Sequence, residues 1–253
     1  MALALARPRS ISLAGWLRIG VRLLAMLSLL TLCVPLYYVH RLVRLHNPWP
    51  RIFLGGVAWI AGVDLTYRGE KVRRGAFLLS NHVSWIDIPV LAGATGTAFV
   101  GHDGLAAMPL LKTLCEMNDT VFIARHDRAS IAAQVEAVRT ALSDTGALTV
   151  FPEGTTSDGT GLLTFKSSLL SAIEPIPAGI AIQPVLLDYG PEAAEVAWVG
   201  EEHGLDNFLR ILARGRPVKL TVHFLDPLSG AQLTNRKTIA QAAREAMLRA
   251  LTG

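Results

Sequence analysis

The sequence predicts an α/β fold: a mixed, partly parallel sheet flanked by helices, preceded by an N-terminal membrane-associated helical segment. Three observations predict it. One long uncharged run lies near the N-terminus, the excess of positive charge accompanies that run, and short apolar runs alternate with helical stretches over the rest of the chain. The 253 residues are 51% hydrophobic and only 17% charged, which excludes a disordered or collagen-like chain.

The N-terminal segment combines apolar length with positive charge. Between Arg22 and His40 lie 17 uncharged residues, which as a helix reach about 25 Å, slightly less than a ~30 Å hydrocarbon core. Residues 1–63 contain seven arginines and no carboxylate, whereas residues 64–253 contain 17 basic and 20 acidic side chains. This distribution favours contact with anionic lipid headgroups and argues against a nucleic-acid partner.

We therefore expect residues 1–63 to form a membrane anchor. The second apolar piece, 52–63, is too short to cross a bilayer alone, so a helical hairpin or a monotopic helix that dips into one leaflet is the simplest arrangement, with Pro35 as the place for a kink. A cleaved signal peptide and a buried core helix are the alternatives. No small-x-small cleavage site follows the run, which continues into His40 and Arg41.

Residues 64–253 are expected to form one further domain. Its apolar runs of strand length are 77–80, 97–100, 121–124, 147–151, 181–187 and 220–224, and its helical stretches are 85–92, 129–142, 205–213 and 238–251. Such alternation is typical of a partly parallel sheet between helices. In sheets of this kind, functional side chains gather at the carboxyl ends of the strands.

The first polar cluster begins where the run 77–80 ends. His82 lies between an expected strand and an expected helix, a position that suits a general base. If His82 sits in the turn before the helix, Asp87 can fold back to its ring and stabilise the imidazolium that forms when a hydroxyl proton is taken. Residues 84–87 also have the form of a helix capping box, and both roles can hold together.

The second polar cluster, residues 151–159, follows the apolar run 147–150. Its glycines, threonines and serine can present backbone N–H groups and hydroxyls to a phosphate or another oxyanion, although the same residues are common in ordinary turns. Arg125, at the end of the run 121–124, can bind a phosphate or carboxylate, or it can be a solvated arginine near Asp127. No grouping of residues has metal-ligand spacing, so the sequence predicts no metal and no cofactor.

Taken together in this order, the blocks resemble the glycerolipid acyltransferase family, that is, the 1-acylglycerol-3-phosphate acyltransferases and their relatives. Asn81, His82 and Asp87 match the family's first block, and residues 151–155, Phe-Pro-Glu-Gly-Thr, match the third. Residues 122–125 are similar to the second block and residues 183–185 to the fourth. Four ordered blocks with this spacing make the resemblance specific.

The resemblance implies that a fatty acyl group passes from an acyl thioester, carried by CoA or by acyl carrier protein, to the free hydroxyl of a lysolipid in a membrane. His82 would be the general base and Asp87 its orienting partner, and the acceptor headgroup would be held by Arg125, Glu153, Gly154 and Thr155. The site would lie on the cytoplasmic side of a bacterial inner membrane. A thioesterase or lipid hydrolase that uses the same pair to activate water is the alternative.

One departure from the family pattern bears on the acceptor. Members that accept a phosphate-bearing lysolipid usually carry arginine after Phe-Pro-Glu-Gly-Thr, whereas this chain has Thr156, which cannot form a bidentate contact with phosphate. Residues 151–159 are similar to bacterial branches that acylate lyso-ornithine lipid. Lyso-ornithine lipid is therefore one expected acceptor and 1-acylglycerol-3-phosphate is the other, because Arg125 and Lys166 are still available to bind a phosphate.

Overall fold

The structure is a computed structural model that describes residues 11–102, 109–123, 136, 140–142, 145–173, 176 and 179–252. The described helices are α1 (Leu13–Leu42), α2 (Trp49–Ala61), α3 (Asp87–Thr95), α4 (Pro109–Met117), α6 (Ala193–Val196), α7 (Gly204–Leu212) and α8 (Arg236–Thr252). The described strands are β1 (Val63–Arg68), β2 (Ala76–Ser80), β3 (Ala98–His102), β4 (Val121–Ile123), β5 (Ala147–Val150), β6 (Ala181–Asp188) and β7 (Val218–Phe224). Short 3-10 turns are η3 (Ser167–Ile173), η4 (Gly190–Glu192) and η5 (Gly230–Leu233).

The described strands form a single mixed sheet in the order β1-β7-β6-β2-β5-β3-β4. Among them, only β6 and β7 pair antiparallel; the other neighbouring strands are parallel. The prediction of a mixed, partly parallel sheet flanked by helices is confirmed. Because β2, β5 and β6 are adjacent and parallel, the residues that follow them meet at one edge of the sheet.

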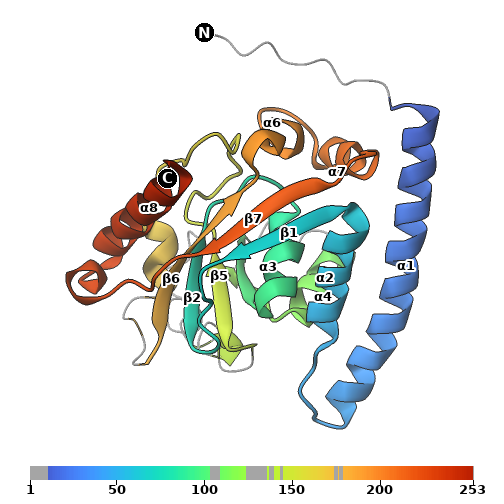
Figure 1. Ribbon diagram of the computed structural model, residues 1–253. Coiled ribbons are helices and arrows are strands. Elements are labelled where there is room, and N and C mark those ends of the chain that lie inside the picture. The colour runs from blue at the N-terminus through green and yellow to red at the C-terminus, as the bar shows by residue number, and fades with distance from the viewer. Residues whose placement is uncertain are drawn as a thin grey trace.

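Helices cover both faces of the sheet (Figure 1). Side chains of β2 alternate between two cores: Leu78 packs into the core shared with α2, α3 and α7, while Phe77 and Leu79 pack into the core shared with α8 and η3. Strand β6 divides its residues in the same way. This two-sided burial explains why the central strands are continuous apolar runs in the sequence.

The sequence-based expectations missed strand β1 and helix α4, as well as the short helix α6. Helix α3 begins at Asp87 rather than at residue 85. Strand β1 lies at the edge of the sheet beside β7, and its buried and exposed residues alternate only weakly, so its sequence carries little signal of a strand. Of the helix predicted over 129–142, residues 136 and 140–142 are described, and they are helical.

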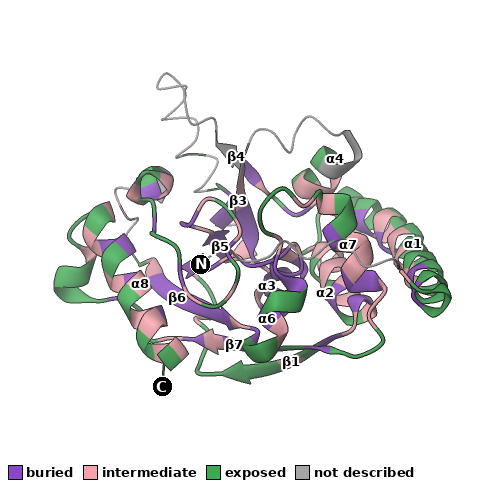
Figure 2. Ribbon diagram, turned by 90° about the horizontal axis from the view of Figure 1, so that it is seen from above, coloured by how far each residue is buried: buried purple, intermediate pink, exposed green. Residues whose placement is uncertain are grey.

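Helices α1 and α2 pack against each other as a hairpin. The Ser12 hydroxyl caps α1 by accepting from the Gly15 N–H at 3.1 Å, and α2 ends at Gly62, whose φ of +89° favours glycine. Pro35 lies inside α1. Within the described chain, α1 is the one helix long and apolar enough to cross a membrane, and 11% of its apolar 18-residue window is buried. A buried core helix is therefore excluded, and Figure 2 shows α1 along one side of the molecule with most of its surface exposed.

Close backbone contact and arginine side chains dock the hairpin on the domain. Helix α2 crosses α3 where Gly55 meets Gly93, so closely that a Cβ on Gly93 would lie 2.6 Å from the Gly55 Cα. Arg22 donates to the Leu212 carbonyl at 2.9 Å at the end of α7, and Arg51 donates to the Gly93 carbonyl at 3.0 Å near the end of α3. Both arginines thus bind carbonyls at the C-termini of helices. From the sequence, the arginines of residues 1–63 were expected to contact lipid headgroups, and this contact within the protein was not predicted.

Candidate active site

The site begins at the carboxyl end of β2. The side chain of Asn81 continues the pairing of β2 with β6: its Nδ2 donates to the Leu187 carbonyl at 3.0 Å, and its Oδ1 accepts from the Leu187 N–H at 2.7 Å. Asn81 is buried, so both hydrogen bonds are shielded from water. This amide fixes the backbone at the point where the chain leaves the sheet and turns toward α3.

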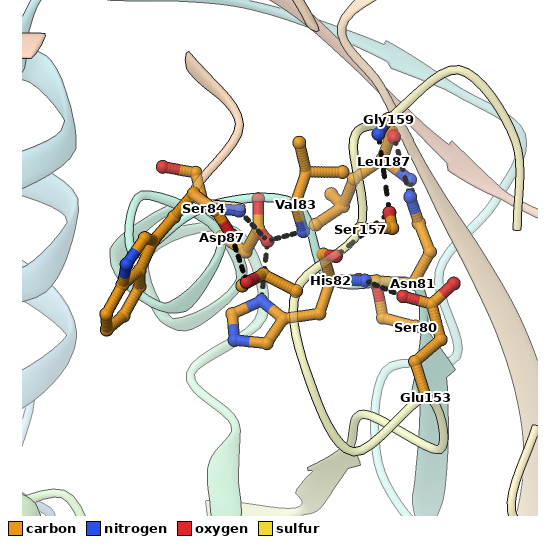
Figure 3. Close-up of polar contacts among 12 residues, drawn as sticks. Ser80, Asn81, His82, Val83, Ser84, Asp87, Glu153, Ser157, Gly159 and Leu187 are labelled. Atoms are coloured by element: carbon orange, nitrogen blue, oxygen red, sulfur yellow. Dashed lines mark hydrogen bonds and ion pairs between the residues drawn. The ribbon is translucent and has the colours of Figure 1, made fainter. Parts of the chain in front are cut away.

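His82 and Asp87 form a hydrogen-bonded pair, with 2.7 Å between His82 Nδ1 and Asp87 Oδ2 (Figure 3). The same Oδ2 accepts from the backbone N–H groups of Val83 at 2.6 Å and Ser84 at 2.9 Å. Asp87 is fully buried in the first turn of α3, where the helix dipole also stabilises a negative charge. The sequence-based expectation that Asp87 folds back to the His82 ring matches this geometry.

The capping box expected over residues 84–87 is only half formed. The Asp87 carboxylate accepts from the Ser84 N–H, but the Asp87 N–H is bonded to the Ser84 carbonyl at 3.1 Å and not to its hydroxyl. The buried Ser84 hydroxyl makes no hydrogen bond within the described part of the chain. Asp87 therefore shapes the turn and holds the histidine with one oxygen.

Aromatic rings fix the plane of the histidine ring. The ring of His82 stacks on Phe151 with 4.2 Å between centroids and 17° between planes, and Phe151 in turn stacks on Phe99 at 6.0 Å. The His82 side chain retains 18% of its exposure, whereas its partner Asp87 has none. With Nδ1 turned to Asp87 and one ring face covered, Nε2 lies on the far side of the ring from the carboxylate (Figure 3).

Glu153 holds the backbone of the histidine. Its Oε2 accepts from the His82 N–H at 3.1 Å and its Oε1 accepts from the Leu163 N–H at 3.0 Å, and only 1% of the residue is exposed. Burial raises the pKa of the Glu153 carboxyl, and the two N–H donors partly oppose that shift. Both carboxylate oxygens are thus engaged within the protein, a geometry that suits support of the His82 turn better than direct contact with a substrate.

The loop after β5 wraps around the same turn. The His82 carbonyl accepts from the Ser157 N–H at 2.7 Å, and the hydroxyl of Thr156 donates to the Trp198 carbonyl. Gly154 has a φ of +71°, and a Cβ there would lie 3.2 Å from Lys166 Nζ, so glycine gives the exposed lysine room beside the loop. Thr155 is exposed next to it.

The structure thus brings four of the predicted site residues together: His82 and Asp87 in the turn from β2 into α3, and Glu153 and Gly154 in the adjoining loop after β5, with Thr155 beside them. Arg125 lies outside the described residues. Among the described residues, no group of three or more histidine, cysteine, aspartate or glutamate side chains could hold a metal ion. The arrangement is a buried carboxylate behind a partly exposed imidazole, which can accept a proton from a bound hydroxyl or water.

Sequence reasoning missed Tyr189. This buried residue directly follows β6, and its hydroxyl donates to Asp87 Oδ1 at 2.5 Å. Burial, and then the charge of Asp87, raise the pKa of the Tyr189 phenol well above its usual value. Only the strand order could have indicated this residue: β6 is the parallel neighbour of β2, so the residue after β6 lies at the sheet edge where the turn from β2 begins.

Comparison with known proteins shows which proteins the chain is similar to. Residues 64–188 match a family model described as Acyltransferase. The chain is 33% identical over 200 residues to the lyso-ornithine lipid O-acyltransferase of Pseudomonas aeruginosa, covering 75% of this chain and 73% of that protein. It is 31% identical over 134 residues to the 1-acyl-sn-glycerol-3-phosphate acyltransferase of Neisseria gonorrhoeae, covering 53% and 52%.

A solved structure shares the fold. The 1-acyl-sn-glycerophosphate (LPA) acyltransferase PlsC from Thermotoga maritima superposes with a TM-score of 0.63 at 20% identity, covering 93% of this chain and 96% of that chain. The relatives and the family model together confirm the resemblance that the four sequence blocks indicated: this chain is an acyltransferase enzyme and belongs to the acyltransferase family.

Proposed function

We propose that the protein transfers a fatty acyl group from an acyl thioester, carried by CoA or by acyl carrier protein, to the free hydroxyl of a lysolipid, with His82 as general base. The observation that carries this proposal is the 2.7 Å hydrogen bond between His82 Nδ1 and Asp87 Oδ2, which leaves Nε2 as the ring nitrogen able to accept a proton. A hydroxyl that is hydrogen-bonded to Nε2 loses its proton to the ring as its oxygen attacks the thioester carbonyl.

The proposed reaction balances without an acyl-enzyme. The new ester C–O bond forms, the carbonyl becomes tetrahedral, and its collapse breaks the C–S bond. The departing thiolate takes the proton that His82 had received, so the enzyme returns to its starting state. Asp87 stabilises the imidazolium between these two proton transfers and stays ionised throughout.

We further propose lyso-ornithine lipid as the acceptor. Its headgroup carries a carboxylate in place of a phosphate, so it does not need the arginine that phosphate-accepting members have at the position of Thr156. In this chain the Thr156 hydroxyl is already bonded to the Trp198 carbonyl. Gly154, Thr155 and the exposed Lys166 beside them belong to the proposed headgroup site, to which the family resemblance adds Arg125. The same cations support 1-acylglycerol-3-phosphate as the second candidate.

A transfer assay separates these possibilities. Membranes that contain the protein receive a labelled acyl thioester together with lysophosphatidic acid, lyso-ornithine lipid or no acceptor. Diacyl product from the ornithine acceptor alone supports the proposed acceptor, and diacyl product from lysophosphatidic acid alone overturns it. Free fatty acid in the absence of any acceptor, with no diacyl lipid in its presence, would instead identify a thioesterase or lipid hydrolase.

We propose that residues 1–63 anchor the enzyme in the membrane and that residues 64–253 catalyse the reaction. Support comes from the exposed apolar side chains of the hairpin, which include Leu17, Leu24, Val39 and Trp59. Side chains of this size that face outward on two neighbouring helices are typical of a surface that lies in lipid. We also propose that the site lies on the cytoplasmic side of a bacterial inner membrane, the side on which acyl thioesters are supplied.

A further inference from the structure

Tyr189 lies behind the carboxylate of the histidine–aspartate pair. It follows the last residue of β6, and 2% of it is exposed. Its hydroxyl donates to Asp87 Oδ1 at 2.5 Å. A phenol that donates to an ionised carboxylate makes a charge-assisted hydrogen bond, which is shorter and stronger than a bond between neutral groups.

The two oxygens of Asp87 have different partners. Oδ2 accepts from His82 Nδ1, from the Val83 N–H and from the Ser84 N–H, whereas the Tyr189 hydroxyl binds Oδ1. Donors on both oxygens, coming from opposite ends of the group, prevent the carboxylate from turning about its Cβ–Cγ bond. The oxygen that faces the imidazole is therefore always the same one.

We propose that Tyr189 is a positioning residue of the acyl transfer reaction: its hydroxyl holds the buried Asp87 carboxylate ionised and oriented, so that Oδ2 keeps His82 aligned. This inference rests on the proposed function, because Tyr189 acts only through Asp87 and His82. No bond to Tyr189 forms or breaks during the reaction. The phenol keeps its proton, since both burial and the neighbouring carboxylate raise its pKa.

The need for such a donor follows from the burial of Asp87. A carboxylate without exposure to water is costly to keep ionised unless its oxygens are hydrogen-bonded. Two titratable side chains besides Tyr189 lie near Asp87 in this cluster: His82 at 2.7 Å, and the buried Glu153, whose pKa the charge of Asp87 helps to raise. Loss of the Tyr189 hydroxyl would leave the Asp87 charge less stabilised and therefore make the pair take up a proton more readily.

The variant Tyr189→Phe tests the proposal because it removes the hydroxyl and keeps the ring and the backbone contacts of the turn, such as the Glu192 N–H donating to the Tyr189 carbonyl at 3.0 Å. Tyr67→Phe, at an exposed position on β1, is the matched control. We expect kcat of Tyr189→Phe to fall about 10-fold, the effect of one hydrogen bond to a charged group, with KM for a labelled acyl-CoA unchanged. We also expect the acid limb of its pH–rate profile to move to higher pH.

A second measurement keeps the proposal testable if Tyr189→Phe does not fold. The chain has four tyrosines, so in a variant with phenylalanine at positions 37, 38 and 67, biosynthetic 3-fluorotyrosine enters only at position 189. Its phenol is a stronger acid and a stronger donor of similar size. The acid limb should then move to lower pH, opposite to the Tyr189→Phe result.

A purely structural role of Tyr189 predicts a different outcome. Tyr189→Phe would then lower the thermal midpoint or the yield, while kcat per folded molecule and the pH profile stay as in the wild type, and that result would overturn the inference.

His82→Ala, measured in parallel, separates the role of Tyr189 from the proposed function. If His82→Ala keeps wild-type turnover, the proposed function itself fails; if His82→Ala is inactive and Tyr189→Phe is unaffected, only the inference about Tyr189 fails.

Discussion

A single side chain, His82, performs the proton transfers of the proposed reaction, so its replacement has the largest expected effect. His82→Ala removes the general base but leaves the surrounding backbone bonds to Glu153 and Ser157 in place. We expect kcat to fall by roughly 10²- to 10⁴-fold, the usual contribution of a positioned general base. Turnover of purified His82→Ala protein equal to that of the wild type would falsify the mechanism.

The matched variant is Asp87→Asn. An amide at this position keeps the size of the side chain but lacks the charge that stabilises the imidazolium. Its NH2 group would also face hydrogen-bond donors, because the groups around Asp87 all donate to its oxygens. We expect a loss of activity of similar order to that of His82→Ala, together with a lower thermal midpoint. Exposed Asp206→Asn controls for the loss of a carboxylate elsewhere.

Glu153 predicts a dependence of stability on pH. Its pKa is raised in the folded protein, mainly by burial, so the folded state holds the proton more tightly than the unfolded chain does. The stabilisation from the protonated form is therefore complete below the usual glutamate pKa of about 4.3 and is lost as the pH rises through the higher folded pKa. The unfolding free energy of the wild type should fall over that window.

Glu153→Gln removes this titration. Its unfolding free energy should change less with rising pH than that of the wild type, although at every pH one side-chain N–H of glutamine opposes a backbone donor, at a cost of about 1–3 kcal/mol. Chemical denaturation in detergent between pH 4 and pH 8 measures both effects, with exposed Glu201→Gln as the control. Parallel curves for Glu153→Gln and the wild type would contradict the assignment.

At the site, the sequence alone indicated the pair of His82 and Asp87 but not what surrounds it. The pair is local, five residues apart in one turn, so spacing was sufficient. Phe151, Tyr189 and Leu187 reach the turn from other strands, and only the strand order brings them there. The family resemblance implied that Glu153 holds the acceptor headgroup, whereas its carboxylate is turned inward to the His82 N–H.

At the scale of elements, burial on both faces decided which parts of the fold were predictable. The central strands β2, β5 and β6 are fully or almost fully buried and were found within one or two residues. Strand β1 was missed because most of its residues are exposed or half-buried and it lies at the sheet edge. Alternation along a short edge strand is a weak signal compared with a continuous apolar run.

The crossing of α2 and α3 gives a prediction for an element pair. A Cβ on Gly93 would lie 2.6 Å from the Gly55 Cα, a backbone atom that cannot move without shifting the helix. We expect Gly93→Ala to destabilise the protein by about 1–3 kcal/mol, as overpacking of a close contact does, and to lower activity because α3 carries Asp87 in its first turn.

Gly20→Ala is the matched control for that substitution. Gly20 also lies within a helix, α1, but nothing lies within 4 Å of the position of its Cβ. Alanine there should be neutral or stabilising, since it favours the helix over glycine. Thermal unfolding of the two variants in the same detergent tests the pair; equal midpoints for both would show that the two helices do not cross as closely as the structure has them.

At the scale of the whole molecule, the hairpin and the catalytic fold share one core. Ile19 of α1 and Ala58 of α2 belong to the same buried cluster as Val90 of α3 and Leu220 of β7. Arg22 adds a polar contact to the end of α7. Because the inner side of the hairpin is packed on the domain, only its outer side is free for the proposed membrane contact, and α1 does not project alone from the protein (Figure 1).

This arrangement predicts that membrane contact can be removed without unfolding the enzyme. The outer face presents Leu17 and Leu24 on α1 and Trp59 on α2, three large side chains that are mostly exposed. Each large apolar side chain placed in lipid contributes roughly 1.5–3 kcal/mol to binding, so replacement of all three by glutamate should lower membrane affinity by several orders of magnitude. Sedimentation with vesicles that contain anionic lipid measures the loss.

The same variant separates anchoring from catalysis. Its acyl transfer to a lysolipid dispersed in detergent should stay near the wild-type rate, because the three side chains are mostly exposed and belong to α1 and α2, outside the turn and the loop that carry the site. Its activity on lysolipid in vesicles should fall with binding. Glutamate at three exposed uncharged positions in and just before α8, Thr234, Gln241 and Thr252, adds the same negative charge and is the control. If the variant with glutamate at positions 17, 24 and 59 still sediments with vesicles as the wild type does, the membrane lies against a different face of the molecule.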